Sequence, residues 1–213
     1  MTVRVASSDV PRALDVIREQ GIVAIVRAGS PETAATSVAT LIEAGLRAIE
    51  VSLVTPDALN VVRDAAAEAP SGVAIGVGTV LTSAEVAAAA EAGARFIVSP
   101  VFDPEVVRGA VEARLDVLPG VATPTEAVSA VRAGATAVKL FPASLWTPMA
   151  LDEVRRALPW LETVPTGGVS PTTAPEWIRA GATAVGIGSA LTRADDPAVA
   201  ARSLLDAITR ARK

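Results

Sequence analysis

Apolar and polar positions divide the chain into two kinds of segment that alternate from one end to the other. Short apolar runs such as 21–26 are typical of buried parallel strands, whereas apolar residues spaced by three or four, as in 30–45, are typical of amphipathic helices. Four of the runs contain an Ala-Gly pair, where glycine suits the left-handed residue that ends a helix. The sequence contains eight candidate strands, at 21–26, 44–51, 72–79, 92–99, 115–121, 133–140, 162–169 and 180–187.

The segments after these runs begin with signals for helix N-termini. Ser30 followed by Pro31 is an N-cap with proline at the first helical position, and similar starts open the segments 55–69, 82–93, 103–113 and 123–134. Strands that alternate with helices predict parallel βαβ units. We therefore expect a single-domain α/β protein over residues 1–213, a (β/α)8 TIM barrel with an extra N-terminal helix over 9–20 that caps its floor. An open doubly wound sheet is the alternative, but no Gly-x-Gly-x-x-Gly fingerprint follows the first strand.

Composition narrows the possible chemistry. The sequence has no cysteine and no histidine, which excludes thiol nucleophiles, histidine bases and ordinary zinc sites but leaves an oxygen-ligated ion open. The amine chemistry considered below needs neither a metal nor a cofactor, and we expect none. A net charge of −4 and 3% aromatic residues argue against a nucleic-acid partner. Charges and prolines interrupt every apolar run, and the N-terminus lacks a signal-peptide core, so we expect a cytoplasmic protein with no membrane partner.

One lysine lies where desolvation is costly. Lys139 is the only lysine besides the terminal Lys213, and it lies within an apolar run. The period of two along a strand places Lys139 on the face opposite Val138, and Glu50 on the face opposite Ile49. If the apolar faces meet the helices, both charged side chains point into the mouth of the barrel, where such folds carry their chemistry.

Two interpretations of this pair remain open from the residues alone. A structural salt bridge would satisfy two buried charges. Alternatively, Lys139 is an amine nucleophile and Glu50 is its acid/base partner; a lysine amine loses its proton when desolvated, whereas an arginine keeps its own. Burial would lower the pKa of Lys139 and a nearby Glu50 would raise it, so the balance stays undecided. The use of lysine in a chain that otherwise prefers arginine favours amine chemistry.

Two glycine-rich sequences follow the last two candidate strands, at 165–170 and 186–191. Barrels often bind phosphate with the loops at these positions, because glycines let the backbone approach an anion. Ser189 could donate a further hydrogen bond. Ordinary left-handed turns are the alternative for either loop alone, but two such loops in the expected positions favour an anion site.

In combination, these motifs resemble the class I aldolases for 2-keto-3-deoxy-6-phosphogluconate (KDPG) and 4-hydroxy-2-oxoglutarate (KHG). The resemblance extends over essentially the whole chain, and its order and spacing are highly specific. It is carried by residues 22–34, 48–53, 76–82, 96–100, 118–126, 138–143, 164–170 and 185–191.

The resemblance implies a (β/α)8 barrel that assembles as a homotrimer, with a role for each matched residue. Lys139 corresponds to the residue that forms the Schiff base, and Glu50 to the acid/base. Thr79 orients the keto acid and Arg27 contacts its carboxylate. The remaining matches are the pocket-lining residues Pro100, Gly120 and Phe141 and the phosphate-binding positions Gly167, Gly168, Gly188 and Ser189.

The sequence departs from part of the family at Val54, where some members carry a second arginine for the carboxylate. Arg27 must then act alone, which affects the choice of substrate more than the type of reaction. We expect cleavage of KDPG to pyruvate and glyceraldehyde 3-phosphate. The alternatives are the galactonate epimer or unphosphorylated 4-hydroxy-2-oxoglutarate as substrate, a phosphosugar isomerase or epimerase, or a barrel that binds a metabolite without catalysis.

Overall fold

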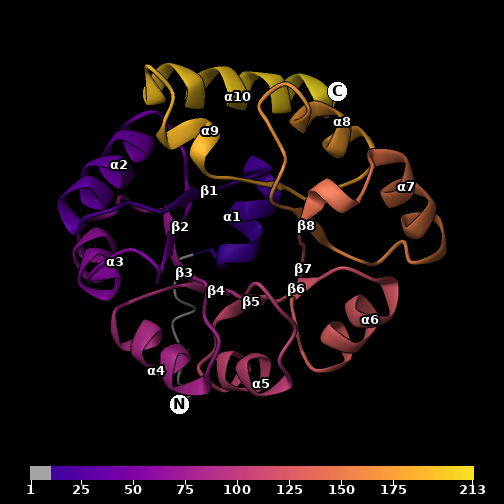
Figure 1. Cartoon of the computed structure of the whole chain (residues 1–213), viewed down its shortest axis with the longest axis horizontal. Helices are drawn as coiled ribbons and strands as arrows, with labels where there is room; N and C mark the ends of the chain where they lie inside the picture. Colours follow the sequence, from indigo (N-terminus) through magenta and orange to yellow (C-terminus); the bar gives the residue numbers. More distant parts are fainter. Residues whose placement is uncertain (1–10) are drawn as a thin grey trace, which may run out of the picture.

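The computed structural model describes residues 11–213, so residues 9 and 10 of the expected first helix lie outside it. Strands and helices largely alternate along the described chain, and most of the helices form a ring around the strands (Figure 1). The strands are β1 Ile22–Val26, β2 Ala48–Ser52, β3 Ala74–Gly78, β4 Phe96–Val98, β5 Asp116–Leu118, β6 Gly120–Val121, β7 Val138–Leu140, β8 Thr163–Pro165 and β9 Val185–Ile187. The helices are α1 Ala13–Gln20, α2 Pro31–Glu43, α3 Ala58–Glu68, α4 Ser83–Glu91, α5 Pro104–Glu112, α6 Pro124–Arg132, η1 Ala143–Leu145, α7 Pro148–Ala157, α8 Ala174–Arg179, α9 Ser189–Thr192 and α10 Pro197–Ala211.

Local sequence signals explain where most helices begin and end. The Ser30 side chain accepts a hydrogen bond from the backbone N–H of Thr33 at the start of α2, while Thr82 and Thr123 form capping boxes at the starts of α4 and α6. The glycine of each predicted Ala-Gly pair has a positive φ; the values are 97° at Gly45, 84° at Gly93, 109° at Gly134 and 90° at Gly181. The predicted helix ends are therefore confirmed at all four positions.

All paired strands are parallel and form two sheets. The larger has the order β5-β4-β3-β2-β1-β9, and the smaller has the order β6-β7-β8. Hydrogen bonds cross both junctions between the sheets. Thr166 after β8 pairs with Gly186 of β9, and the backbone N–H of Thr136 before β7 donates to the carbonyl of Val117 in β5 at 3.2 Å.

Two apolar clusters lie on the two faces of the strands. The outer cluster contains Ile49, Val51, Val138 and Leu140 and packs against the surrounding helices. The inner cluster contains Ala48 and Ala137 from the alternate positions, together with Leu14 and Ile17 of α1. Helix α1 accordingly appears at the centre of the helix ring (Figure 1). The alternation predicted for the second and sixth candidate strands is confirmed.

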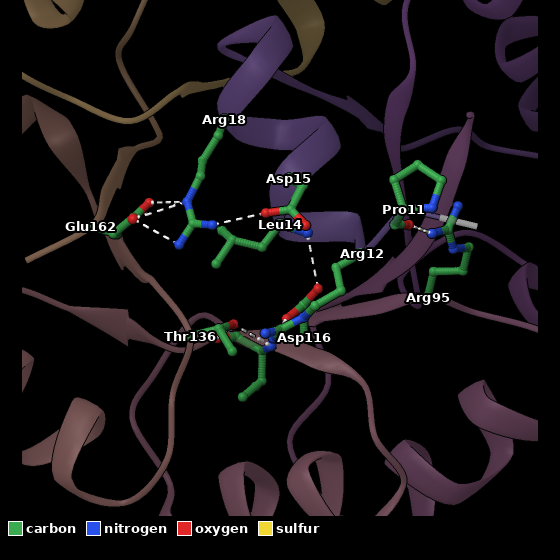
Figure 2. Close-up of polar contacts among 10 residues, drawn as sticks. Pro11, Arg12, Leu14, Asp15, Arg18, Arg95, Asp116, Thr136 and Glu162 are labelled. Atoms are coloured by element: carbon green, nitrogen blue, oxygen red, sulfur yellow. Dashed lines mark hydrogen bonds and ion pairs between the residues drawn. The ribbon is translucent and has the colours of Figure 1, made fainter. Parts of the chain in front are cut away.

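Polar contacts join α1 to the amino-terminal ends of the strands (Figure 2). The backbone N–H of Leu14 donates to Asp116 Oδ2 at 2.9 Å, and Arg12 forms an ion pair with the same carboxylate. Farther along the helix, Arg18 Nε donates to Glu162 Oε1 at 2.9 Å, just before β8. These contacts hold α1 against the amino-terminal ends of β5 and β8.

Among the boundaries that differ from the sequence prediction are those of α3 and of the fifth candidate strand. The segment 55–69 was expected to start with Thr55 as the N-cap, but α3 begins at Ala58 with Asp57 as its N-cap. The Thr55 hydroxyl instead accepts a hydrogen bond from the backbone N–H of Ala28 at 3.2 Å. The run 115–121 forms two short strands separated by Pro119, which lacks a backbone donor. Its carbonyl still accepts a hydrogen bond from the Lys139 backbone N–H at 2.9 Å. Over residues 11–213, none of the helices combines the length and apolar character needed to cross a membrane.

Candidate active site

Lys139 and Glu50 line the same pocket. Lys139 is the central residue of β7 and Glu50 the central residue of β2; they are only 6% and 2% exposed. The pocket has a volume of about 350 Å³ and is also lined by Arg27, which follows β1. Within the described residues, no ion pair joins Lys139 to Glu50. The pocket therefore presents a buried amine and a buried carboxylate that are not bonded to each other.

Burial shifts both groups toward their neutral forms. It lowers the pKa of the Lys139 amine; the Glu50 carboxylate acts in the opposite direction, and the Arg27 guanidinium lowers the pKa further. Burial raises the pKa of Glu50, against the attraction of Lys139 and Arg27 for its charged form. An amine that loses its proton readily can act as a nucleophile, and a carboxyl group with a raised pKa can accept and return a proton.

Phe141 lies beside the amine. Lys139 Nζ is 4.7 Å from the centroid of the Phe141 ring, within the range of a cation–π contact. The ring also lines the pocket, as the sequence predicts for this position. Its side chain therefore forms an apolar wall next to the lysine.

The two glycine-rich loops open onto the same pocket as Lys139. Gly167 and Gly168 follow β8 with φ values of 83° and 92°, a conformation that favours glycine. Gly188 and Ser189 follow β9, and all four residues line the pocket. The structure thus brings the charged pair and both predicted loops together in one cavity.

Three other candidates, Thr79, Pro100 and Gly120, are not among the residues that line the pocket. Thr79 Oγ1 is 2.8 Å from Ser52 Oγ and Thr79 has a positive φ of 64°. Gly120 pairs with Lys139 across β6 and β7, and a Cβ built on it would lie 2.1 Å from the carbonyl oxygen of Pro100. The contacts that the structure gives these three residues are therefore with neighbouring strands and loops and not with the pocket.

Several lining residues were missed by the sequence reasoning. Thr166, between the last β8 residue and Gly167, faces the pocket, and its place two positions after Val164 gives it the inward face. That signal was present in the sequence. Arg193, after the short helix α9, also lines the pocket, but its position follows no strand periodicity. Val54 is 61% exposed and is not among the lining residues.

Comparisons with known proteins show similarity to one family of aldolases. The family model for KDPG and KHG aldolase matches residues 14–207. The Rhizobium meliloti protein named "Probable 2-dehydro-3-deoxy-6-phosphogalactonate aldolase" is 42% identical over 81% of this chain and 82% of its own. The Pseudomonas aeruginosa 2-dehydro-3-deoxy-phosphogluconate aldolase is 40% identical over 59% of this chain and 57% of its own. Among solved structures, the "Native KDPGal structure" has a TM-score of 0.78 at 36% identity, covering 89% of this chain and 93% of that chain.

The family match spans most of the chain, and the similarity to the Rhizobium protein extends over four-fifths of both sequences. The structural match shows that the α/β fold with parallel strands is also shared. The chain therefore belongs to the KDPG and KHG aldolase family and is an aldolase, a class of lyase, as its sequence predicts.

Proposed function

We propose that this aldolase is of class I and forms an imine between Lys139 and the C2 ketone of a 2-keto-4-hydroxy acid. The observation that carries the proposal is the environment of the Lys139 amine. It is 6% exposed, its pKa is lowered by burial, and it shares a pocket with the Glu50 carboxylate without an ion pair between them in residues 11–213. A structural salt bridge would instead bring the two charged groups into contact.

The proposal also concerns whether the two sheets close into one barrel. Backbone hydrogen bonds cross both junctions between the two sheets, at Thr166–Gly186 and at Thr136–Val117. We infer that the strands form one closed (β/α)8 barrel, in which β5 and β6 together make the fifth strand. The pocket that Lys139 and Glu50 line also includes residues that follow β8 and β9, so it would lie at the carboxyl-terminal face of that barrel, where active sites of this fold lie.

The reaction begins with attack of the neutral Lys139 amine on C2. Loss of water leaves a protonated imine that can accept an electron pair. The Glu50 carboxylate, directly or through water, takes the proton of the C4 hydroxyl. The C3–C4 bond breaks, its electrons form an enamine, and an aldehyde leaves. Protonation of the enamine at C3 and hydrolysis of the imine then release pyruvate and regenerate Lys139.

The ends of the substrate would contact different parts of the pocket. Arg27, which follows β1 and lines the pocket, would bind the carboxylate in a charge-assisted contact. The backbone of Gly167 and Gly168, with Ser189, would bind a distal phosphate. A 2-keto-3-deoxy-6-phosphohexonate has its carboxylate, ketone and phosphate in that order, so it matches the arrangement.

Two epimers of this substrate are supported by different observations. The motif resemblance points to the gluconate series, and the Pseudomonas relative carries that name. The Rhizobium relative and the Escherichia coli 2-dehydro-3-deoxy-6-phosphogalactonate aldolase, which is 38% identical over 81% of this chain and 85% of its own, favour the galactonate series. The epimers differ only at C4, so the same pocket and the same Lys139 chemistry serve both.

A substrate panel tests this proposal. Release of pyruvate is followed with a coupled dehydrogenase for both phosphorylated epimers and for 4-hydroxy-2-oxoglutarate. We expect kcat/KM to be highest for one of the phosphorylated epimers, and the preferred epimer identifies the series. Release of pyruvate from none of the three would refute the proposed reaction, and preference for 4-hydroxy-2-oxoglutarate would refute the phosphate contact.

Assembly as a homotrimer is the other part of the proposal that the family resemblance implies. The loops after β2, β3 and β4 each expose one apolar side chain; Val54 is 61%, Leu81 47% and Val101 51% exposed. Apolar side chains exposed at neighbouring loops are often covered in an oligomer. Light scattering on the purified chain should give three times the mass of 21.6 kDa.

A further inference from the structure

A second pocket lies at the opposite ends of the strands from Lys139. It is formed where helices α1, α7 and α10 end and where the chain enters β8 and β9, and its volume is about 410 Å³. We call it the floor pocket. Its side chains carry three guanidinium groups, one carboxylate and one indole, from Arg18, Arg155, Arg212, Glu162 and Trp160.

Arg18 is neutralised by neighbouring carboxylates (Figure 2). Its Nη2 is 2.8 Å from Glu162 Oε1, and its Nη1 is 2.8 Å from Asp15 Oδ1. Glu162 is the only carboxylate among the lining residues of the floor pocket. The positive charges of the other two arginines therefore have no partner of opposite charge in the pocket wall.

Arg155 and Arg212 are bonded to backbone carbonyl groups only, within the part of the chain that the structure describes. Arg155 Nη1 donates to the carbonyl of Leu161 at 2.8 Å, and Arg212 Nη2 donates to that of Thr183 at 3.0 Å. A guanidinium group has five N–H donors, and most of those on Arg155 are not used by these bonds. Partial burial lowers the pKa of Arg212, and no carboxylate offsets that effect.

Two glycines allow these guanidinium groups to lie close to the backbone. A Cβ at Gly181 would be 2.5 Å from Arg155 Nε, and a Cβ at Gly21 would be 2.5 Å from Arg212 Nη2. Both glycines also have a positive φ, at 90° and 77°. Each guanidinium is thus bonded to a backbone carbonyl and occupies the space beside a glycine, so part of its side-chain freedom is already lost before an anion binds.

We propose that the floor pocket binds the phosphate group of a small phosphorylated metabolite, with Arg155 and Arg212 donating to its oxygens and Trp160 packing against its organic part. Guanidinium groups bind phosphate with paired donors, and Trp160 is 52% exposed at the pocket wall. The site stands apart from the proposed aldol chemistry and does not depend on it. The alternative is a purely structural role, in which both arginines only donate hydrogen bonds to backbone carbonyls. In that case the floor pocket has no affinity for anions.

Titration with inorganic pyrophosphate tests the proposal on the full-length protein at low ionic strength. Binding is measured by calorimetry and by the fluorescence of Trp160, which lines the floor pocket and not the pocket of Lys139. We expect a fluorescence change in the wild type that disappears in Trp160→Phe. Arg155→Gln and Arg212→Gln should each weaken binding about tenfold or more, the usual size of a lost charge-assisted contact.

Arg156→Gln is the matched control, because Arg156 lies on the same helix with its own partner, Asp152, at 2.7 Å and does not line the floor pocket. It should leave pyrophosphate affinity within about twofold. Equal weakening by Arg156→Gln and Arg155→Gln would show a general charge effect and overturn the proposal. So would a fluorescence change that persists in Trp160→Phe, or no detectable binding at millimolar pyrophosphate. If Arg155→Gln fails to fold, Arg155→Lys keeps the charge, removes the paired donors and should still weaken binding.

Discussion

Glu50 Oε1 occupies the space that a side chain at position 78 would need. A Cβ built on Gly78 would lie 1.8 Å from that oxygen, far inside van der Waals contact. Gly78 ends β3, which pairs with β2 in register along the residues that flank Glu50. The absence of a side chain on the neighbouring strand therefore allows the carboxylate to lie where it lines the pocket.

Replacement of Gly78 by alanine should displace the carboxylate and slow cleavage. The expected loss in kcat is roughly 10²–10⁴, the span for a positioned acid/base group, and Glu50→Gln should fall in the same range. Both variants should still form the pyruvate imine, because Lys139 is unchanged. Gly29→Ala is the control, since a Cβ there meets no atom within 4 Å. Normal turnover in a folded Gly78→Ala or Glu50→Gln protein would exclude the acid/base role of Glu50. If the main effect of Glu50→Gln is instead a lower melting temperature, Glu50 and Lys139 form a structural pair.

Borohydride reduction in the presence of pyruvate should attach one adduct, at Lys139. The chain offers only one other lysine, Lys213, so peptide mapping by mass spectrometry separates the two possibilities. Lys139→Ala should lose the adduct. Lys139→Arg should be inactive as well, because a guanidinium keeps its proton. Labelling that continues unchanged in Lys139→Ala would disprove the assignment of the nucleophile.

The pH dependence of borohydride trapping of the pyruvate imine should shift in opposite directions when Glu50 and Arg27 are each replaced by glutamine. Trapping needs the neutral amine, so it rises with pH through the pKa of Lys139, at a lower pH than for an ordinary lysine because burial lowers that pKa. Glu50 raises this pKa and Arg27 lowers it. Glu50→Gln should therefore move the midpoint of the trapping rate to lower pH, and Arg27→Gln should move it to higher pH. Shifts of the same sign in both variants would contradict the electrostatic arrangement of the pocket.

Kinetic measurements can distinguish the residues that bind the carboxylate end of the substrate from those that bind its phosphate end. Arg27→Ala should lower kcat/KM by about 10- to 150-fold for phosphorylated and unphosphorylated keto acids alike, since a charge-assisted contact contributes roughly 1.5–3 kcal/mol. A side chain at Gly168 or Gly188 should reduce kcat/KM mainly for the phosphorylated substrate. The ratio of kcat/KM between a phosphorylated epimer and 4-hydroxy-2-oxoglutarate cancels general damage to the fold. An unchanged ratio in the glycine variants would show that these loops do not bind the phosphate.

The sequence alone determined the features that depend on local periodicity. Ala48 and Glu50 share one face of β2 because side chains alternate along any strand, and Ala48 does lie in the inner cluster. The left-handed glycines after the helices and the capping boxes at Thr82 and Thr123 likewise need only a few neighbouring residues. The motif spacing was also specific enough to indicate the family, which the comparisons confirm.

Tertiary structure decided which distant residues meet. The contact of Gly78 with Glu50 depends on the register of β3 against β2. The Thr55 hydroxyl, predicted to cap a helix, instead accepts a hydrogen bond from the distant Ala28 N–H. Arg193 enters the active-site pocket through the path of the chain after β9, which no repeat predicts. The floor pocket joins arginines at positions 18, 155 and 212, whose helices end at the same face of the molecule. Local patterns specify the face on which a side chain lies, but its neighbours across space follow from strand pairing and helix packing, which involve residues far apart in sequence.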